Sequence, residues 1–231
     1  MSTPHTTCWT IIRGAAAGDA AQRQEFAKRY AEPIAAYLRA RWQSSLLAQD
    51  VDDAVQEVFV ECCRENGALE RASESKTAAG GFRGYLYGVA RNVALRLEQR
   101  RGRRRERQPP EGLITHGLVE DEARLSHVFD HAWAAGIMRE AAQRHAESAA
   151  SVGEAAVRRV DLLRLRFGEG LPIRDIAARW DVAAESLHRE YAKAREEFRG
   201  ALREVIAFHA PGSTAEIDAE AGILLASLQG G

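Results

Sequence analysis

The sequence has little cysteine and no long run of apolar residues. Its three cysteines are an odd number, and Cys62 and Cys63 are adjacent, so no disulfide framework is indicated. No apolar run approaches the length of a membrane span, and the N-terminus lacks the basic start and long apolar centre of a secretory signal. We therefore expect a reduced, cytoplasmic protein without membrane insertion.

The sequence also lacks the motifs of common catalytic sites. It contains no Gly-rich phosphate loop, no nucleophile motif and no paired catalytic carboxylates. His127 and His131 have zinc-ligand spacing, but no third ligand lies nearby and the intervening residues lack the glutamate of a metalloprotease helix. His5 and Cys8 form an HxxC pair that the later cysteines could join across space. We expect no metal site, no cofactor and no independent catalysis. A helical metal enzyme using the histidine pair is kept as an alternative.

The charge of the chain is unevenly distributed. The whole protein has a formal net charge of -1. Eight arginines and two glutamates give residues 91–107 a charge of +6, so the rest of the chain carries -7. A local basic face on a nearly neutral protein indicates a directed contact with a polyanion.

Apolar residues recur at helical spacing along nearly the whole chain, and no β-hairpin signature or internal repeat is present. Asp19 with Gln22, and later Asp50 and Ser213, are placed to cap helices. Residues 66–81, rich in Gly, Ala, Ser and Glu, are expected to form a loop. Residues 108–120, which include two prolines, are expected to form a linker. The sequence therefore predicts an all-α fold.

Three further features refine the helical pattern. Pro33 restarts it within the region before residue 42. A long helix is expected over 121–147, with a break near 148–153. The helix predicted over 155–167 has its apolar residues in register at four positions: Val157, Val160, Leu163 and Phe167.

The most informative block follows Gly168 and Gly170. A short helix ends at Trp180, Asp181-Val182 forms a tight turn, and a longer amphipathic helix begins. This is the helix-turn-helix arrangement, in which the N-terminal residues of the second helix read base edges in the major groove.

Three segments together resemble bacterial RNA polymerase sigma factors of the extracytoplasmic-function (ECF) type. DVDDAVQEVFVECCRE (50–65) looks like the helix with which these factors grip the clamp helices of polymerase. FRGYLYGVARNVALRLEQRRGRR (82–104) looks like the segment that melts and reads the promoter -10 element. LLRLRFGEGLPIRDIAARWDVAAESLHREYAKAREEF (162–198) is similar to the helix-turn-helix that reads the -35 element.

The resemblance implies site residues in each segment. The residues expected to bind core polymerase are Asp52, Asp53, Gln56 and Glu57. Those expected to contact the -10 element are Tyr85, Arg91, Asn92, Arg96, Arg100, Arg101, Arg103 and Arg104. Those expected to contact the -35 element are Glu185, Ser186, His188, Arg189 and Lys193. The partners implied are core RNA polymerase and promoter DNA, and an anti-sigma factor is a candidate partner.

The implied organisation is a polymerase- and -10-binding domain over 1–107, the linker 108–120, a -35-binding domain over 121–209 and an extension over 210–231. The chain departs from the family at Asp181, where the turn usually carries Gly, and at Ala183, where a Ser-like cap is usual. The extension either caps the core or docks on the DNA-binding domain and limits promoter access. A stand-alone helix-turn-helix regulator is the alternative function, although it gives the 50–63 and 82–107 helices no role.

Overall fold

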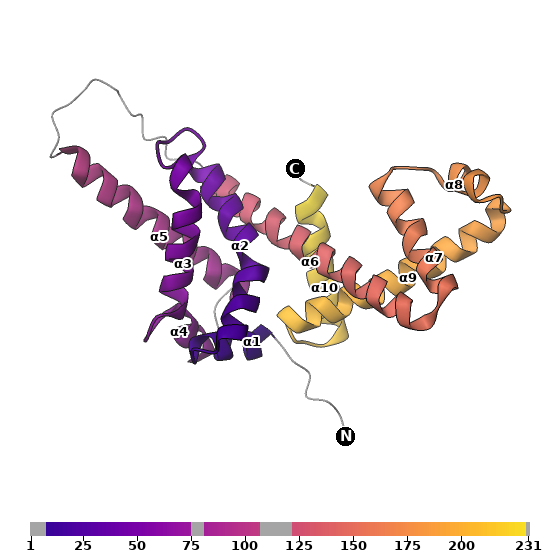
Figure 1. Cartoon of the computed structure of the whole chain (residues 1–231), viewed down its shortest axis with the longest axis horizontal. Helices are drawn as coiled ribbons and strands as arrows, with labels where there is room; N and C mark the ends of the chain where they lie inside the picture. Colours follow the sequence, from indigo (N-terminus) through magenta and orange to yellow (C-terminus); the bar gives the residue numbers. More distant parts are fainter. Residues whose placement is uncertain (1–7, 75–80, 107–121, 230–231) are drawn as a thin grey trace. The chain divides into compact units, whose positions relative to one another are not determined.

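A computed structural model of the chain describes residues 8–74, 81–106 and 122–229 (Figure 1). Every regular element in these ranges is helical and none is a strand, which confirms the all-α prediction. In the same ranges, no helix combines the length and apolar character needed to cross a membrane. The predicted linker 108–120 lies outside the described residues.

The chain divides into two compact units. The first consists of residues 1–136 with two short later segments, 208–210 and 222–231. Its helices are α1 (Cys8–Ala16), α2 (Ala20–Trp42), α3 (Val51–Cys63), α4 (Ala68–Glu74), α5 (Gly81–Glu106) and the first half of α6 (Glu122–Val152).

Aromatic side chains fill the centre of the first unit. The Phe26 ring lies 4.9 Å from the Tyr30 ring, and Tyr30 stacks on Trp133 of α6 at 5.2 Å. Helices α2, α3 and α5 pack on one another (Figure 1), with Val58 of α3 and Leu86 of α5 fully buried. This apolar packing leaves the polar faces of α3 and α5 at the surface.

Helix α2 begins as the sequence predicts. The Asp19 carboxylate accepts a hydrogen bond from the Gln22 backbone N–H at 3.0 Å, which satisfies one of the free donors of the first turn. The helix does not restart at Pro33, because α2 continues through this residue to Trp42. Pro33 and Ile34 are both buried, so packing holds the helix together where one backbone donor is missing.

The prediction that residues 66–81 form only a loop is wrong. Residues 68–74 form α4, and Ala68, Leu69 and Ala72 are buried. The spacing of these residues places them on one face of a two-turn helix. A helix this short has a weak periodic signal and depends on tertiary packing.

The second unit consists of residues 137–207 and 211–221. It contains the second half of α6, α7 (Glu154–Leu163), a π-helical turn η2 (Arg164–Gly168), α8 (Ile173–Trp180), most of α9 (Ala184–His209) and part of α10 (Thr214–Gln229). Its compact core includes Leu162, Leu165, Ile176 and Leu187. These residues join α8 to α9 across the turn at Asp181. That the pair acts as a DNA-reading helix-turn-helix stays a prediction.

Helix α6 is longer than the sequence suggests. It continues to Val152, and the break predicted near 148–153 is confined to Gly153. Gly153 has φ 128° and ψ -178°, a conformation that is open essentially to glycine alone. One residue therefore separates α6 from α7.

The buried face predicted for α7 is wrong. Val157 is 41% exposed and Phe167 is 68% exposed, whereas the residues that turn inward are Ala156, Arg159, Leu162 and Leu165. The buried face of the helix differs from the predicted one because a charged residue, Arg159, is one of the residues that face the core. Sequence patterns assign arginine to the outer face unless it has buried partners.

Helix α10 begins with a capping box. Ser213 Oγ accepts from the Glu216 backbone N–H at 3.4 Å, and a Glu216 carboxylate oxygen accepts from the Ser213 backbone N–H at 2.7 Å. Asp218 receives two hydrogen bonds from Arg203 of α9, at 2.7 and 3.2 Å. Arg203, through which α10 contacts α9, comes after Lys193, the last residue of α9 that is predicted to contact the -35 element. Whether the extension limits promoter access stays a hypothesis.

The turn between α8 and α9 contains a strained residue. Asp181 is left-handed, with φ 51° and ψ 51°, and its backbone N–H lies 3.3 Å from the Ala178 carbonyl. The Val182 N–H bonds back to the Ala177 carbonyl at 3.0 Å, closing the end of α8. A left-handed residue with a Cβ is disfavoured relative to glycine.

Asp181→Gly is expected to raise the free energy of unfolding by about 0.5 kcal/mol, because glycine adopts the left-handed conformation without a Cβ penalty. Urea denaturation followed by circular dichroism measures the change. The matched control is Ala178→Gly, an exposed position inside α8, where the same residue should cost about 1 kcal/mol. A loss of stability in Asp181→Gly would show that the aspartate side chain stabilises the turn.

Candidate nucleic-acid interface

The polar side of α3 is exposed along its length. Asp52, Asp53 and Gln56 are exposed, and Glu57 is partly exposed, while Val51, Ala54, Val58 and Cys62 are buried. We call the four residues Asp52, Asp53, Gln56 and Glu57 the α3 acidic face. Asp50 occupies the predicted cap position but makes no side-chain capping bond.

Sequence reasoning missed one member of this surface. Val60 is 65% exposed. It follows Gln56 by four residues and Glu57 by three, so helical spacing places it beside both. The signal that could have identified it is its absence from the apolar stripe of α3. An exposed valine therefore lies next to the C-terminal end of this surface.

Helix α5 presents part of its arginine-rich side to solvent. Asn92, Arg96, Arg100 and Arg103 are exposed, Arg91 and Arg101 are partly exposed, and Val93 and Ala94 face the core. The side chain of Arg104 lies outside the described part of the chain. Tyr85 is only partly exposed, and its hydroxyl donates to the Ala68 carbonyl at 2.7 Å. Tyr85 therefore joins α5 to α4.

Three arginines of α5 face carboxylates that precede or lie on α3. Arg96 pairs with Glu61 at 3.2 Å, Arg100 with Glu57 at 3.3 Å, and Arg101 with Asp50 at 2.8 Å. The arginine numbers rise (96, 100, 101) while the numbers of their carboxylate partners fall (61, 57, 50), as expected for antiparallel neighbouring segments. We call these pairs the acid–arginine ladder. Its arginine side chains are 34% to 57% exposed.

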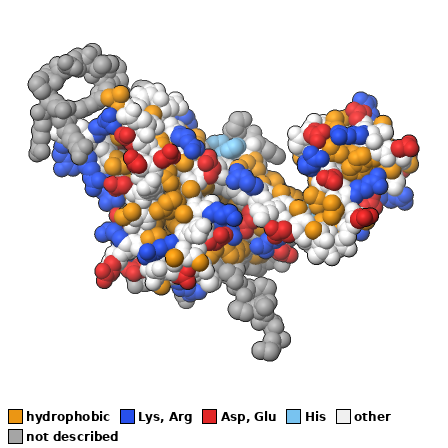
Figure 2. Space-filling view, in the orientation of Figure 1, with side chains coloured by type: hydrophobic (Ala, Val, Ile, Leu, Met, Phe, Trp, Pro, Cys, Tyr) orange, Lys and Arg blue, Asp and Glu red, His pale blue; other side chains and the backbone are white. Residues whose placement is uncertain are grey.

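Glu61 has additional partners. Arg64 lies 2.9 Å from its carboxylate and Arg71 lies 3.5 Å away. Burial acts to raise the pKa of Glu61, but hydrogen bonds from Arg64 and Arg96 outweigh it and hold the pKa below its ordinary value. Glu61 therefore stays ionised at neutral pH. Figure 2 shows acidic and basic side chains interspersed on the visible face of the first unit.

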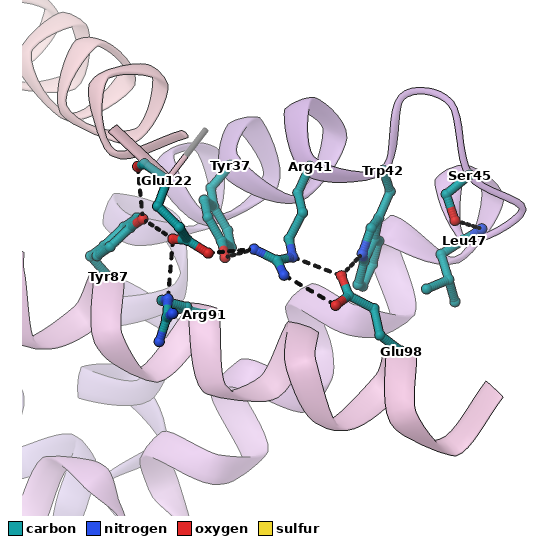
Figure 3. Close-up of polar contacts among 9 residues, drawn as sticks. All are labelled: Tyr37, Arg41, Trp42, Ser45, Leu47, Tyr87, Arg91, Glu98 and Glu122. Atoms are coloured by element: carbon teal, nitrogen blue, oxygen red, sulfur yellow. Dashed lines mark hydrogen bonds and ion pairs between the residues drawn. The ribbon is translucent and has the colours of Figure 1, made fainter. Parts of the chain in front are cut away.

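A second polar network ties α2, α5 and α6 together inside the first unit (Figure 3). Arg41 donates to both Glu98 oxygens, at 2.7 and 3.1 Å, and to Glu122 at 2.9 Å. The indole N–H of Trp42 donates to Glu98 at 2.8 Å. The Arg41 side chain is only 13% exposed, so this arginine is shielded from solvent. Its charge serves to join helices.

Glu122 connects this network to a predicted DNA contact. Arg91 lies 3.1 Å from Glu122, and the Tyr87 hydroxyl donates to Glu122 at 2.9 Å. Burial raises the pKa of Tyr37, next to Arg41, to about 12. Burial acts to raise the pKa of Glu122 too, but hydrogen bonds from Arg41, Tyr87 and Arg91 hold it below its ordinary value. The carboxylate at the start of α6 therefore holds Arg91 at the surface of α5.

The second unit exposes every residue predicted to read the -35 element. Glu185, Ser186, His188, Arg189 and Lys193 are all exposed on the first turns of α9. The opposite side of the helix carries the buried residues Leu187 and Ala194. The side chains available for a groove are thus those of the N-terminal half of α9.

A buried arginine holds α9 in place. The Arg159 side chain, 6% exposed, donates to both Glu197 oxygens, at 2.7 and 2.8 Å. It also donates to Glu190 at 3.4 Å and to the Ala155 carbonyl at 3.0 Å. Hydrogen bonding to Arg159 lowers the pKa of Glu197. The sequence analysis missed Arg159, because arginine is expected at the surface and its partner Glu197 comes close only in the folded chain.

Phe167 is a second feature that sequence reasoning missed. It lies in the π-helical turn η2 and its ring is 6.4 Å from that of Tyr191. Arg195 lies over the Tyr191 ring at 5.7 Å. Hydrophobic side chains are visible on the second unit among charged ones in Figure 2. π-helical turns are rare and are often found at functional sites.

No cluster of three or more His, Cys, Asp or Glu able to hold a metal occurs in the ranges that the structure describes. His5 lies outside them. Cys8, Cys62 and Cys63 are free thiols, and burial raises the pKa of all three, for Cys8 to about 12. Raised thiol pKa values disfavour the thiolate that binds metals.

No family model matches the chain, and no curated protein matches it.

Proposed function

We propose that this chain is a sigma factor of the extracytoplasmic-function type, which directs core RNA polymerase to promoters in the cytoplasm. The α3 acidic face binds polymerase, the arginines of α5 contact the -10 element, and the start of α9 reads the -35 element. The chain supplies specificity and promoter opening, and the polymerase supplies the chemistry. The proposed domains are 1–107 and 121–209, joined by the linker 108–120.

One observation carries the proposal. An exposed acidic face lies on α3 with the exposed Val60 next to its C-terminal end, and an arginine-rich helix packs directly beside it. An exposed apolar side chain beside polar ones is a feature of protein–protein interfaces, whose buried parts are apolar and whose edges are polar. Arginines on the neighbouring helix suit nucleic-acid phosphates and unstacked bases. The two surfaces together support a protein that binds a basic protein and a polyanion at once.

Val60→Asp is expected to weaken binding to purified core RNA polymerase by at least about tenfold, since a charge would replace the exposed apolar side chain of the contact. Fluorescence anisotropy of the labelled full chain measures the affinity, and run-off transcription measures its consequence. Val157→Asp is the matched control, because Val157 is also exposed but lies on α7. Wild-type chain that fails to bind core polymerase would overturn the proposed function.

The alternative is a stand-alone helix-turn-helix regulator, favoured by the exposed residues at the start of α9. Such a regulator would bind duplex operators without polymerase. A comparison of duplex and forked -10 probes, each with and without core polymerase, separates the two. Preference for the forked probe supports a sigma factor, and duplex binding independent of polymerase supports the regulator.

A further inference from the structure

Four arginines proposed to contact promoter DNA each face a carboxylate of the same chain. Three belong to the acid–arginine ladder: Arg96, Arg100 and Arg101. The fourth, Arg91, pairs with Glu122. All four pairs have N–O separations between 2.8 and 3.3 Å. A carboxylate at this distance takes the position that a phosphate oxygen would take beside the same guanidinium.

The ladder contributes little to holding the helices together. In the Arg100–Glu57 and Arg101–Asp50 pairs both side chains are 34% to 57% exposed, and ion pairs that reach solvent to this extent are weak and screened by salt. In the third pair Arg96 is 45% exposed but Glu61 only 15%. Val58 and Cys62 of α3, together with Leu86 and Val93 of α5, are buried and supply the packing. By contrast, the Arg41 side chain in the same unit is only 13% exposed, and an arginine shielded from solvent in this way can stabilise helix packing. The Arg100 and Arg101 pairs are therefore the readily exchangeable ones.

Glu57 belongs to both surfaces. It belongs to the α3 acidic face, and its carboxylate also receives the Arg100 guanidinium at 3.3 Å. A cationic group of a protein partner that pairs with Glu57 competes with Arg100. Removal of Glu57 from Arg100 leaves that arginine available to a phosphate.

We propose that the acid–arginine ladder is an electrostatic mask, in which Asp50, Glu57 and Glu61 occupy the arginines of α5 until single-stranded nucleic acid displaces them. Contact of a basic partner with Glu57 lifts part of the mask, so binding of the partner and binding of the polyanion reinforce each other. The identity of that partner as polymerase, and of the strand as promoter DNA, rests on the proposed function. The mask itself is a property of the free chain.

The test measures binding of the full chain, without polymerase, to a labelled single-stranded oligonucleotide of about 20 nucleotides at about 50 mM salt. Glu57→Gln is expected to tighten binding about two- to fivefold, the range set by one exposed ion pair. Glu61→Gln provides a second variant, and circular dichroism checks that both are folded. The matched control is Glu65→Gln, an exposed residue with the same charge change that follows α3. Its effect should stay below about 1.5-fold.

A double-mutant cycle separates a specific mask from a general charge effect. In an Arg100→Ala chain, Glu57→Gln should no longer tighten binding, because the arginine that it releases is absent. Equal tightening in both backgrounds, or equal tightening by Glu65→Gln, overturns the mask. The mask is also overturned if a folded Glu57→Gln or Glu61→Gln chain binds the oligonucleotide no more tightly than the wild type does. The case in which neither the wild type nor the variants bind it counts as this result. Failure of the wild-type chain to bind polymerase would instead overturn the proposed function and leave these results standing.

Discussion

Arg41→Ala is expected to lower the free energy of unfolding by about 3 kcal/mol, since it leaves two carboxylates, Glu98 and Glu122, partly buried without their shared cation. Arg41 joins α2 to α5 and α6 (Figure 3), so the loss affects three helices together. Urea denaturation of the full chain, followed by circular dichroism, measures the change. Arg39→Ala is the matched control. Its side chain is 55% exposed and pairs with Glu32, so the expected loss is below about 0.5 kcal/mol.

The acid dependence of stability provides a second measurement on the same variant. The pKa of Glu122 is lower in the folded chain than its ordinary value, so its contribution is full above the ordinary pKa and is lost as pH falls through the lowered pKa. Without Arg41 the lowering is smaller, and stability should depend less on pH in this acidic range. Equal acid dependence in Arg41→Ala and wild type would contradict the role assigned to the network.

Arg159→Ala is expected to cost about 3 kcal/mol, because Glu197 and Glu190 lose the buried cation that joins α7 to α9. Hydrogen exchange of α9 amides should speed up most, since Arg159 attaches that helix to α7 through Glu190 and Glu197. Thermal unfolding of the full chain measures the overall loss. Arg164→Ala is the control, because Arg164 is 63% exposed and its pairs with Asp161 and Glu169 reach solvent.

A paired substitution tests the physical reason for the Arg159 effect. If the cost comes from an uncompensated carboxylate, Arg159→Met combined with Glu197→Leu should recover most of the lost stability, because apolar packing replaces the pair. A double variant as unstable as Arg159→Ala would show that hydrogen bonds to Ala155 and Glu190 carry the stabilisation instead.

Much of the fold follows from patterns within single segments. The cap at Asp19, the capping box at Ser213 and the turn at Asp181 each depend on residues a few positions apart, and all three are present. The errors arise where tertiary packing overrides local pattern. Helix α4 depends on burial of Ala68 and Leu69, and the face of α7 is set by the bonds that the buried Arg159 makes to residues of α9. Neither cause is visible in a short stretch of sequence.

The candidate site divides in the same way. Exposure of Asp53 and Gln56 on α3, and of Arg189 on α9, follows from amphipathic spacing and could be predicted. The pairing of Glu57 with Arg100 could not, because the two residues are 43 positions apart and meet only when α3 packs on α5. Nor could the sequence identify Arg41 of α2, because its partners Glu98 and Glu122 lie on α5 and α6.

The backbone at Gly153 limits how this sequence can vary. Its φ of 128° with ψ of -178° lies outside the region that a residue with a Cβ can occupy at low cost, although no side chain crowds the position. Any other residue there would favour a helical or extended backbone and change the direction in which α7 leaves α6. Relatives that keep these two helices distinct at this point should therefore carry glycine at 153, while neighbouring exposed positions such as Val152 vary freely.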